Sequence, residues 1–465
     1  MDSLSFPFLS VGLASLLVGA GVVLASGSAS VARPRAVVFA LLSLAGFLAG
    51  GLEAIAVPGT PGLLDPLLPW LEADALNAVP MIFFGCLTLF FLLLAPKRDS
   101  DGRQLAGMLI IAFATLLAYA AGNLVVMVVG WWLAGLPFLL GLFGPLRGQR
   151  LAQGFLLASC IALTAAVVLL HNIEIQDLSH ASVLAFSLLI LAVILRKGIT
   201  PFHSWLVSGF EHGPLLPTAL LFNGHLGALL IARSEAVALP LTARHALDIL
   251  CMAALVTALI TSLRGCVERK PRRLLAYICV SQASFILAGL ATANAQGVTG
   301  ALLHWLVVAA ASSGLICIVR VIEVRVRDAA DPSEHLGLAV RAPRLATFFL
   351  ICGLALAGLP GTLGYCAEDL LFHGSLESHP WLGITLLLAT AFNAIHLIRL
   401  FGLLFLGVLP KHVIDIPDAL PRERWPLAAC IVFLIAGGLA PTVVIAWRAP
   451  AARAMTEAMG AKSAH

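Results

Sequence analysis

The sequence predicts an all-α polytopic membrane protein with about fourteen transmembrane helices, two inverted five-helix repeats and breaks in helices 7 and 12. Hydrophobic residues make up 60% of the 465 residues and charged residues only 11%, whereas a soluble domain contains about 25% charged residues. Apolar stretches of about 20 residues, the length of a membrane-crossing helix, recur along the chain. Two of them are interrupted by Gly and Pro beside an ionisable side chain, which is typical of ion transporters.

The apolar segments define the predicted spans in order. They begin near residues 5, 36, 77, 105, 122, 151, 183, 217, 245, 272, 297, 345, 381 and 426. No basic residues precede the first segment, which favours a true span over a cleaved signal peptide. The predicted units are an N-terminal three-helix segment (1–104), a first repeat with helices 4–8 (105–243), a second repeat with helices 9–13 (244–410), and a C-terminal helix and tail (411–465).

Basic residues gather in alternate loops. One set of loops contains Arg33, Arg98, Arg150, Arg269 and Arg341, and the opposite set contains Glu72, Asp74, Glu174 and Asp177. Because basic loops of membrane proteins stay in the cytoplasm, both termini are predicted to lie outside. Arg233 and Arg448 fall on the opposite side and disagree with this orientation.

The two interrupted segments share one plan. In the seventh, Lys197 is followed at once by Gly198 and then by Pro201; in the twelfth, Pro360 and Gly361 precede Glu368. An ionisable side chain at the bilayer centre costs about 2.5–3.5 kcal/mol, and irregular backbone at that depth must lie inside protein or along a wet cavity. The segments are five spans apart, an odd number, so the two repeats are expected to be inverted relative to each other.

Several functional classes are excluded by composition. The net charge is only +4, so nucleic-acid binding is not expected. The nine cysteines form no C-x-x-C pair, and iron–sulfur clusters and structural zinc need clustered thiolates. No pattern for hydrolysis, group transfer or phosphate binding stands out. We therefore expect no cofactor, no metal and no catalytic site of the chain's own.

The run from Arg196 to Arg233 resembles the antiporter-like proton-conducting subunits of respiratory complex I, membrane hydrogenases and multisubunit cation/proton antiporters. These subunits carry a lysine, then a P-F/L-H-x-W-L segment, then a proline-bearing break, as Lys197 and the Pro201–Leu206 segment do here. Other similar stretches are Pro271–Tyr277 with Ser281 and Gln282, Leu302–His304, and Ala357–Thr362 with Glu368. Together they cover most of residues 105–407. The resemblance implies a multi-pass protein of a prokaryotic inner membrane.

The resemblance implies a proton pathway through Lys197, His225, His304 and Glu368. Accessory positions would be His203, Asn223, Glu211, Asn393, His396 and Arg399. Each group also has a structural interpretation. Lys197 would snorkel to the membrane surface, the two pathway histidines would pack as core side chains, and Glu368 would be an interfacial acid. We expect His203 to brace the broken helix and Glu211 to be solvated, and the residues leave Asn393, His396 and Arg399 open between lining water and holding a neighbouring helix.

Two departures from the family pattern bear on function. The fifth span of the family reads W-E, but this chain has Trp131-Trp132, so the glutamate that pairs with the lysine is missing. In the eleventh span, Val308 and Ser312 occupy the places of a later histidine and lysine. Loss of that glutamate puts an ordinary pumping cycle in doubt, because the carboxylate modulates the proton affinity of the lysine.

Three functional hypotheses follow. The first is a subunit that conducts protons, or Na⁺ in their place, within a multisubunit energy-coupling complex, for instance as the translocase part of an oxidoreductase. The second is the membrane subunit of a proton-driven inorganic-carbon (CO₂ or bicarbonate) uptake complex with a soluble zinc partner. The third is a transport-inactive scaffold that anchors a soluble enzyme. All three require further subunits, and the sequence indicates neither the partner nor the direction of transport.

Overall fold

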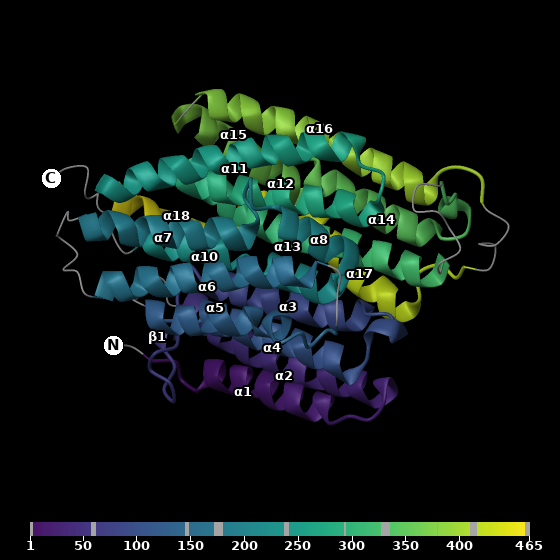
Figure 1. Ribbon diagram of the computed structural model, residues 1–465, viewed down its shortest axis with the longest axis horizontal. Coiled ribbons are helices and arrows are strands. Elements are labelled where there is room, and N and C mark those ends of the chain that lie inside the picture. Colours follow the sequence, from purple (N-terminus) through teal and green to yellow (C-terminus); the bar gives the residue numbers. More distant parts are fainter. Residues whose placement is uncertain are drawn as a thin grey trace.

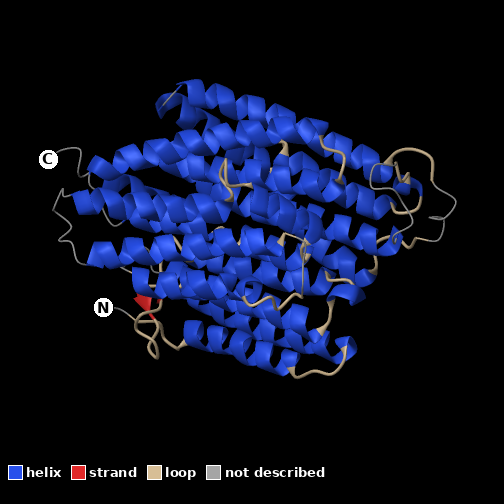
Figure 2. Ribbon diagram, in the orientation of Figure 1, coloured by secondary structure: helices blue, strands red, loops and turns tan. Residues whose placement is uncertain are grey.

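A computed structural model describes residues 3–56, 62–144, 148–171, 180–236, 241–292, 294–326, 335–378, 380–409 and 416–460. In these residues the chain is a bundle of helices that run roughly along one direction, with one small hairpin at one end (Figures 1 and 2). This confirms the predicted all-α class. The acidic loop residues Glu174 and Asp177 lie outside the described part.

The N-terminal segment contains three helices and the hairpin. Its elements are α1 (Phe8–Leu24), α2 (Ala29–Ala56), β1 (Leu63–Leu64), β2 (Glu72–Ala73) and α3 (Ala78–Leu94), followed by the short η1 (Lys97–Asp99). The first amides of α1 have no partner inside the helix, and the buried carboxylate of Asp65 accepts from Leu9 and Ser10 at 3.0 Å each. The hairpin therefore holds the start of α1.

The next helices lie mostly within residues 105–243, the range predicted for the first repeat. They are α4 (Gly102–Tyr119), α5 (Leu124–Leu139), α6 (Gln149–His171), α7 (His180–Lys197), α8 (Ser204–His212), α9 (Leu215–Asn223) and α10 (Leu226–Ala236). The predicted seventh span is broken between α7 and α8, as expected. The predicted eighth span is also broken, between α9 and α10, which the sequence analysis did not anticipate.

The remaining helices begin close to the predicted starts. They are α11 (Leu241–Val267), α12 (Pro271–Ala291), α13 (Ala295–Val326), η3 (Leu338–Val340), α14 (Pro343–Leu356), α15 (Leu363–Ser378), α16 (Pro380–Phe405), α17 (Pro421–Leu439) and α18 (Pro441–Gly460). The predicted twelfth span is broken between α14 and α15. The range of the predicted C-terminal helix and tail contains two helices, α17 and α18, which meet at an angle of 87°. Pro441 has no amide hydrogen to continue α17 and starts a new helix instead.

Membrane-spanning length is reached by many of these helices. Within the described residues, eight helices are long and apolar enough to cross a membrane, with α9 and α10 taken as one, and the bent pair α17 and α18 would make a ninth. The helices α1, α3, α5 and α14 are apolar but shorter. Fourteen crossings and the four unit boundaries stay predictions.

The centre of the bundle is formed by α9, α10, α12 and α13. The apolar windows of these helices are completely buried, whereas only 28% of the window in α2 and 33% of that in α16 are buried. Figure 1 shows α12 and α13 in the middle of the bundle, with α2 and α16 at its edges. Ionisable residues on the central helices are therefore surrounded by protein rather than by lipid.

The two arginines that disagree with the predicted orientation have partners at the end of the bundle that carries the hairpin, here called the hairpin face. Arg233 contacts Glu72 at 2.8 Å and Asp74 at 2.5 Å, and Arg448 donates to the Leu76 carbonyl at 3.0 Å. Acids and a carbonyl thus compensate both cations locally. The opposite end, which contains η1 and the start of α12, is called the basic face below.

Candidate functional site

The break after α7 places a lysine at a helix terminus inside the bundle. Gly198 follows Lys197 with a φ of +68°, a conformation in which glycine has no steric penalty. The last carbonyls of a helix lack partners in the helix, and the indole N–H of Trp205 donates to the Leu195 carbonyl at 2.9 Å. Gly198 and Trp205 together end α7 and turn the chain into α8.

Lys197 is buried, with only 2% of the residue exposed. Its ammonium Nζ donates to the Phe222 carbonyl at 2.9 Å and lies 2.9 Å from Nδ1 of His225. The ammonium also lies 4.0 Å from the centre of the Phe222 ring, within the range of a cation–π contact. The side chain therefore points into the bundle and does not reach the membrane surface.

The partner histidine lies at the second break. His225 is fully buried and has a φ of +42°, which is uncommon for a residue other than glycine. The neighbouring Gly224 carbonyl accepts from the Tyr119 hydroxyl at 2.5 Å, and the Trp305 ring lies 6.0 Å from the imidazole. Tyr119 thus stabilises the interrupted backbone that presents His225 to the lysine. Nε2 of His225 has no hydrogen-bond partner in the part of the chain that the structure describes.

A second polar cluster lies beside this break and links α9 to α13. The amide of Asn223 donates to Ser312 at 3.0 Å and to Ser313 at 2.7 Å, and the Ser312 hydroxyl donates to Oδ1 of Asn223 at 3.2 Å. Val308, one turn earlier on α13, is buried and apolar. Where the resembling family has a lysine, this chain therefore has a neutral hydrogen-bonded serine.

His304 is a buried ionisable residue of the central helix α13. It is fully buried, and neither ring nitrogen has a hydrogen-bond partner among the described residues. The Phe285 ring packs against it at 5.8 Å. His304 and His225 are near enough for their charges to interact, although no hydrogen bond joins them in the described part of the chain.

Glu368 lies on α15 just after the third break. It is 7% exposed, and its Oε2 accepts from the Thr390 hydroxyl at 3.3 Å. The Gln282 side chain lies close to this carboxyl, and its amide donates to the Leu356 carbonyl, the last of α14, at 3.0 Å. Gly358 has a φ of +66°, and a Cβ there would lie 2.6 Å from Oε2. The break and the buried carboxyl therefore fit closely against each other.

Three polar residues spaced three apart on α16, Asn393, His396 and Arg399, have different surroundings. Asn393 donates to the Ser281 hydroxyl at 2.8 Å. His396 is buried without a hydrogen-bond partner among the described residues and packs on Gly265. Arg399 donates to the carbonyls of Gly265 at 3.1 Å and Glu268 at 3.2 Å. Those carbonyls end α11, so Arg399 caps that helix, and the geometry favours a structural role for it.

The accessory residues near α8 lie closer to the basic face. In place of the solvated side chain expected from the sequence, Glu211 is 14% exposed and contacts Lys270 at 2.7 Å and Arg273 at 3.4 Å. This ion-pair cluster joins the end of α8 to the start of α12. His203 is half-buried, with its ring 6.4 Å from Tyr277, and it directly precedes α8, where a bracing role was expected.

A buried arginine beside the lysine was missed by the sequence analysis. Arg196 is 4% exposed, donates to the Trp131 carbonyl at 3.0 Å and lies 4.7 Å from that indole ring. Trp132, at the place of the missing glutamate, donates to Thr164 at 2.9 Å instead. The sequence signal that could have revealed Arg196 is the adjacent Arg-Lys pair before a glycine. No carboxylate of the described residues pairs with either cation.

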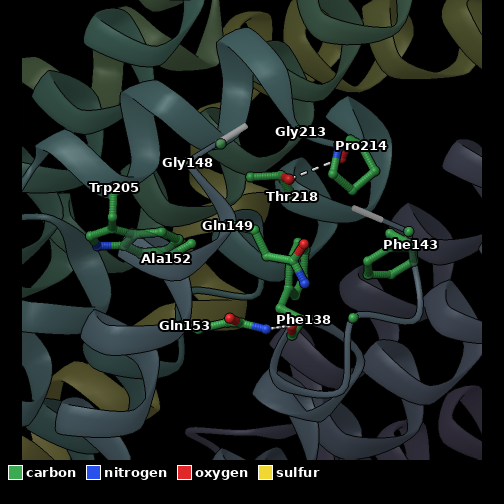
Figure 3. A pocket seen from close by; sticks show the side chains of 13 residues that line it. Phe138, Phe143, Gly148, Gln149, Ala152, Gln153, Trp205, Gly213, Pro214 and Thr218 are labelled. Carbon is green, nitrogen blue, oxygen red and sulfur yellow. Dashed lines mark hydrogen bonds between the residues drawn. The ribbon is translucent and has the colours of Figure 1, made fainter. Parts of the chain in front are cut away.

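A small pocket of about 30 Å³ lies between the α5–α6 connection and α8 (Figure 3). Figure 3 shows Gln149 and Gln153 beside Trp205 and Thr218, and Gln153 donates to the Phe138 carbonyl at 3.1 Å. The volume exceeds the roughly 10–15 Å³ that a cavity needs to hold one water molecule. Because Trp205 also ends α7, the pocket adjoins the first break.

Only some of the predicted pathway residues are joined directly. Lys197 and His225 are in contact, whereas no hydrogen bond between described residues connects them to His304 or Glu368. All four side chains are buried in the bundle. Among the described residues, no group of three or more His, Cys, Asp or Glu side chains is placed to hold a metal ion. The arrangement is a series of separate polar positions on central helices.

Comparison with known proteins gives a consistent result. A family model described as NADH:quinone oxidoreductase/Mrp antiporter, TM matches residues 121–393. NADH-quinone oxidoreductase subunit N 2 of Aquifex aeolicus is 24% identical over 420 residues, covering 82% of this chain and 85% of that protein. Subunit N of Rhodococcus opacus is 28% identical over 317 residues, covering 66% of this chain but only 56% of that protein.

Solved structures show the same fold. A chain of respiratory complex I from Thermus thermophilus with bound NADH matches with a TM-score of 0.84 and 22% identity, covering 97% of this chain and 99% of that chain. A chain of the Mrp complex from Dietzia matches with a TM-score of 0.82 and 18% identity, covering 97% of both chains.

Proposed function

Because the chain belongs to the NADH:quinone oxidoreductase/Mrp antiporter family of membrane proteins, we propose that it conducts protons as one subunit of a larger energy-coupling complex. The single observation that carries this proposal is the buried contact of 2.9 Å between Nζ of Lys197 and Nδ1 of His225. The protein is a multi-pass protein of a prokaryotic inner membrane. The orientation with both termini outside stays a prediction from the loop charges.

The chemistry of this contact suits proton transfer. An ammonium can pass a proton to a neutral imidazole within hydrogen-bond distance, and histidine exchanges protons near physiological pH. Nε2 of His225 is buried and has no hydrogen-bond partner among the described residues, so it can release or receive a second proton on its far side. Lys197 and His225 would then pass a proton in two steps between the end of α7 and the break before α10.

The rest of the route would depend on water between the polar positions. A bridging water is nearly as favourable as a direct hydrogen bond. The pocket beside Trp205 would give access from the basic face to the Lys197 break. His304 would continue the route from His225, and the carboxyl of Glu368, with Gln282 beside it, would be its acidic end near α15.

The surroundings of Arg196 favour a second kind of complex to which a proton-conducting subunit of this type could belong. The family resemblance implies a carboxylate at position 132 that pairs with the lysine, but here the Trp132 indole donates to Thr164, and the guanidinium of Arg196 lies on the Trp131 ring. A proton pathway without that counter-ion suits a complex in which a partner subunit couples proton flow to another process. The inorganic-carbon complex with a soluble zinc partner is therefore the second candidate, and a transport-inactive scaffold is the outcome if no flux is found.

Reconstitution into liposomes that contain a pH-sensitive dye tests the proposal. The full chain, isolated with its partners, should take up protons when a membrane potential is imposed, and Lys197→Met should reduce the initial rate at least tenfold. Lys97→Gln, which removes an exposed lysine of the basic face, is the matched control. Equal rates for the wild type and Lys197→Met would contradict the proposal, and replacing H⁺ gradients by Na⁺ gradients identifies the ion.

Partners are identified by a separate experiment. Co-purification from the native membrane followed by mass spectrometry should recover further membrane or soluble subunits. Redox subunits would favour the oxidoreductase setting, and a soluble zinc protein would favour the inorganic-carbon setting.

A further inference from the structure

A large cavity opens between α3 and α17, away from the proposed proton pathway. Its volume is about 670 Å³, within the range of about 300–1,000 Å³ that is typical of small-molecule sites. The lining is almost entirely apolar and includes Phe83, Leu87 and Phe90 of α3 and Phe433 of α17. The rings of Phe83 and Phe433 lie 5.2 Å apart and join the two helices at the side of the cavity.

One end of the cavity is polar and basic. Arg422 and Trp425, both near the start of α17, also line the cavity, and Trp425 is 70% exposed. Tryptophan beside a cation is typical of the level of the lipid headgroups. Arg33 donates to the Leu93 carbonyl at the end of α3, and it is near enough to Arg422 for their charges to interact.

The positive charge at this end is only partly compensated. Glu423 is 2% exposed, and its Oε2 accepts from Arg325 at 2.5 Å. Arg422 reaches the same carboxylate only at 3.7 Å, and its side chain is 36% exposed. One carboxylate therefore faces Arg325 and Arg422, with Arg33 close by, so the end of the cavity has an excess of positive charge.

We propose that this cavity binds an anionic phospholipid, with an acyl chain between α3 and α17 and the headgroup phosphate against Arg422. An apolar lining with a cation at one end complements a long amphiphile with a negative head. Basic pockets between transmembrane helices bind such headgroups. The site is independent of the proton pathway, because none of its lining residues belongs to that pathway.

Native mass spectrometry of the delipidated full chain tests the proposal. Phosphatidylglycerol and phosphatidylcholine with identical acyl chains are the probes. The wild type should bind phosphatidylglycerol about fivefold more tightly than phosphatidylcholine, the factor expected for one basic residue near the headgroups. Arg422→Gln should remove this preference, whereas Arg269→Gln, an exposed arginine of the same face, should keep it. Equal behaviour of the two variants would overturn the proposal.

A second variant tests the acyl-chain part. Ala429→Trp fills the cavity without changing the charge, so it should weaken the binding of both lipids, and unchanged binding would overturn the proposal. Melting temperatures check that each variant is folded. The competing occupant is a helix of a partner subunit. A photo-reactive residue at position 429 that cross-links to a partner peptide in the native complex, with no bound lipid, would also overturn the lipid assignment.

Discussion

The two predicted breaks share a backbone design but carry opposite chemistry. Each has a glycine with positive φ, Gly198 at +68° and Gly358 at +66°, and each places an ionisable side chain inside the bundle. At the first break Lys197 contacts a histidine and has Arg196 beside it, without a carboxylate partner among the described residues. At the break after α14, Glu368 accepts from the neutral Thr390 hydroxyl and lies near the neutral Gln282, and no cation among the described residues pairs with it.

The difference shows how one fold can hold two kinds of proton site. A buried charge without a counter-ion is costly. Proton binding therefore has opposite electrostatic effects at the two sites. Binding a proton creates a cation at Lys197 and removes an anion at Glu368. The neutral cluster of Asn223 and Ser312 links α9 to α13. His304, which has apolar surroundings, also lies on α13. The predictions below separate the two sites, from the largest expected effect to the smallest.

Replacement of the relay histidine should have the largest effect. In His225→Gln, the amide oxygen can still accept from Lys197, but an amide does not exchange a proton at neutral pH. We expect proton flux in liposomes to fall by about 100-fold, the lower end of the range for loss of acid–base transfer by a positioned group. His373→Gln, at a histidine whose side chain is 56% exposed, is the control. Flux near the wild-type value would show that His225 only packs.

The acidic site should respond less strongly. Glu368→Gln keeps an oxygen that can accept from Thr390 but removes the titrating group, so we expect flux to fall about tenfold, one order below the direct relay. Asp369→Asn is the control, because Asp369 is 48% exposed and contacts His373 rather than the break. If both variants transport like the wild type, Glu368 is an interfacial acid and the route ends elsewhere.

The glycines of the two breaks should differ in their effect on stability. Gly358→Ala combines a left-handed backbone with a Cβ 2.6 Å from Glu368, so we expect a loss of about 2–4 kcal/mol. Gly198→Ala meets its nearest atom at 3.3 Å and should cost about 1–2 kcal/mol. Gly402→Ala, in open space on α16, should be neutral or stabilising by up to about 1 kcal/mol. Thermal unfolding in one detergent measures all three, and equal losses at the two breaks would contradict this ranking.

The sequence predicted the parts of the site that local composition encodes. The lengths of the apolar runs and the charges of the loops predicted where most helices start to within a few residues. Gly and Pro residues predicted the breaks after α7 and after α14. The break at His225 was missed, because Asn-Gly-His in an apolar run is a weak signal. Its irregular backbone depends on the Tyr119 hydroxyl, 105 residues away. The contact of Arg196 with Trp131, 65 residues apart, likewise depends on helix packing and not on local pattern.

The neutral cluster between the two sites should have the smallest effect. Ser312→Ala removes one hydrogen-bond partner of Asn223 but leaves Ser313, 2.7 Å from the Asn223 amide. We expect a loss of about 0.5–1.5 kcal/mol in unfolding free energy and a proton flux within about twofold of the wild type, because a hydroxyl in this position orders the break and carries no charge. Ser313→Ala should behave alike, since both hydroxyls contact the same amide. A loss of flux as large as that of Glu368→Gln would mean instead that the serine lies on the proton route and takes the place of the family's lysine through bound water.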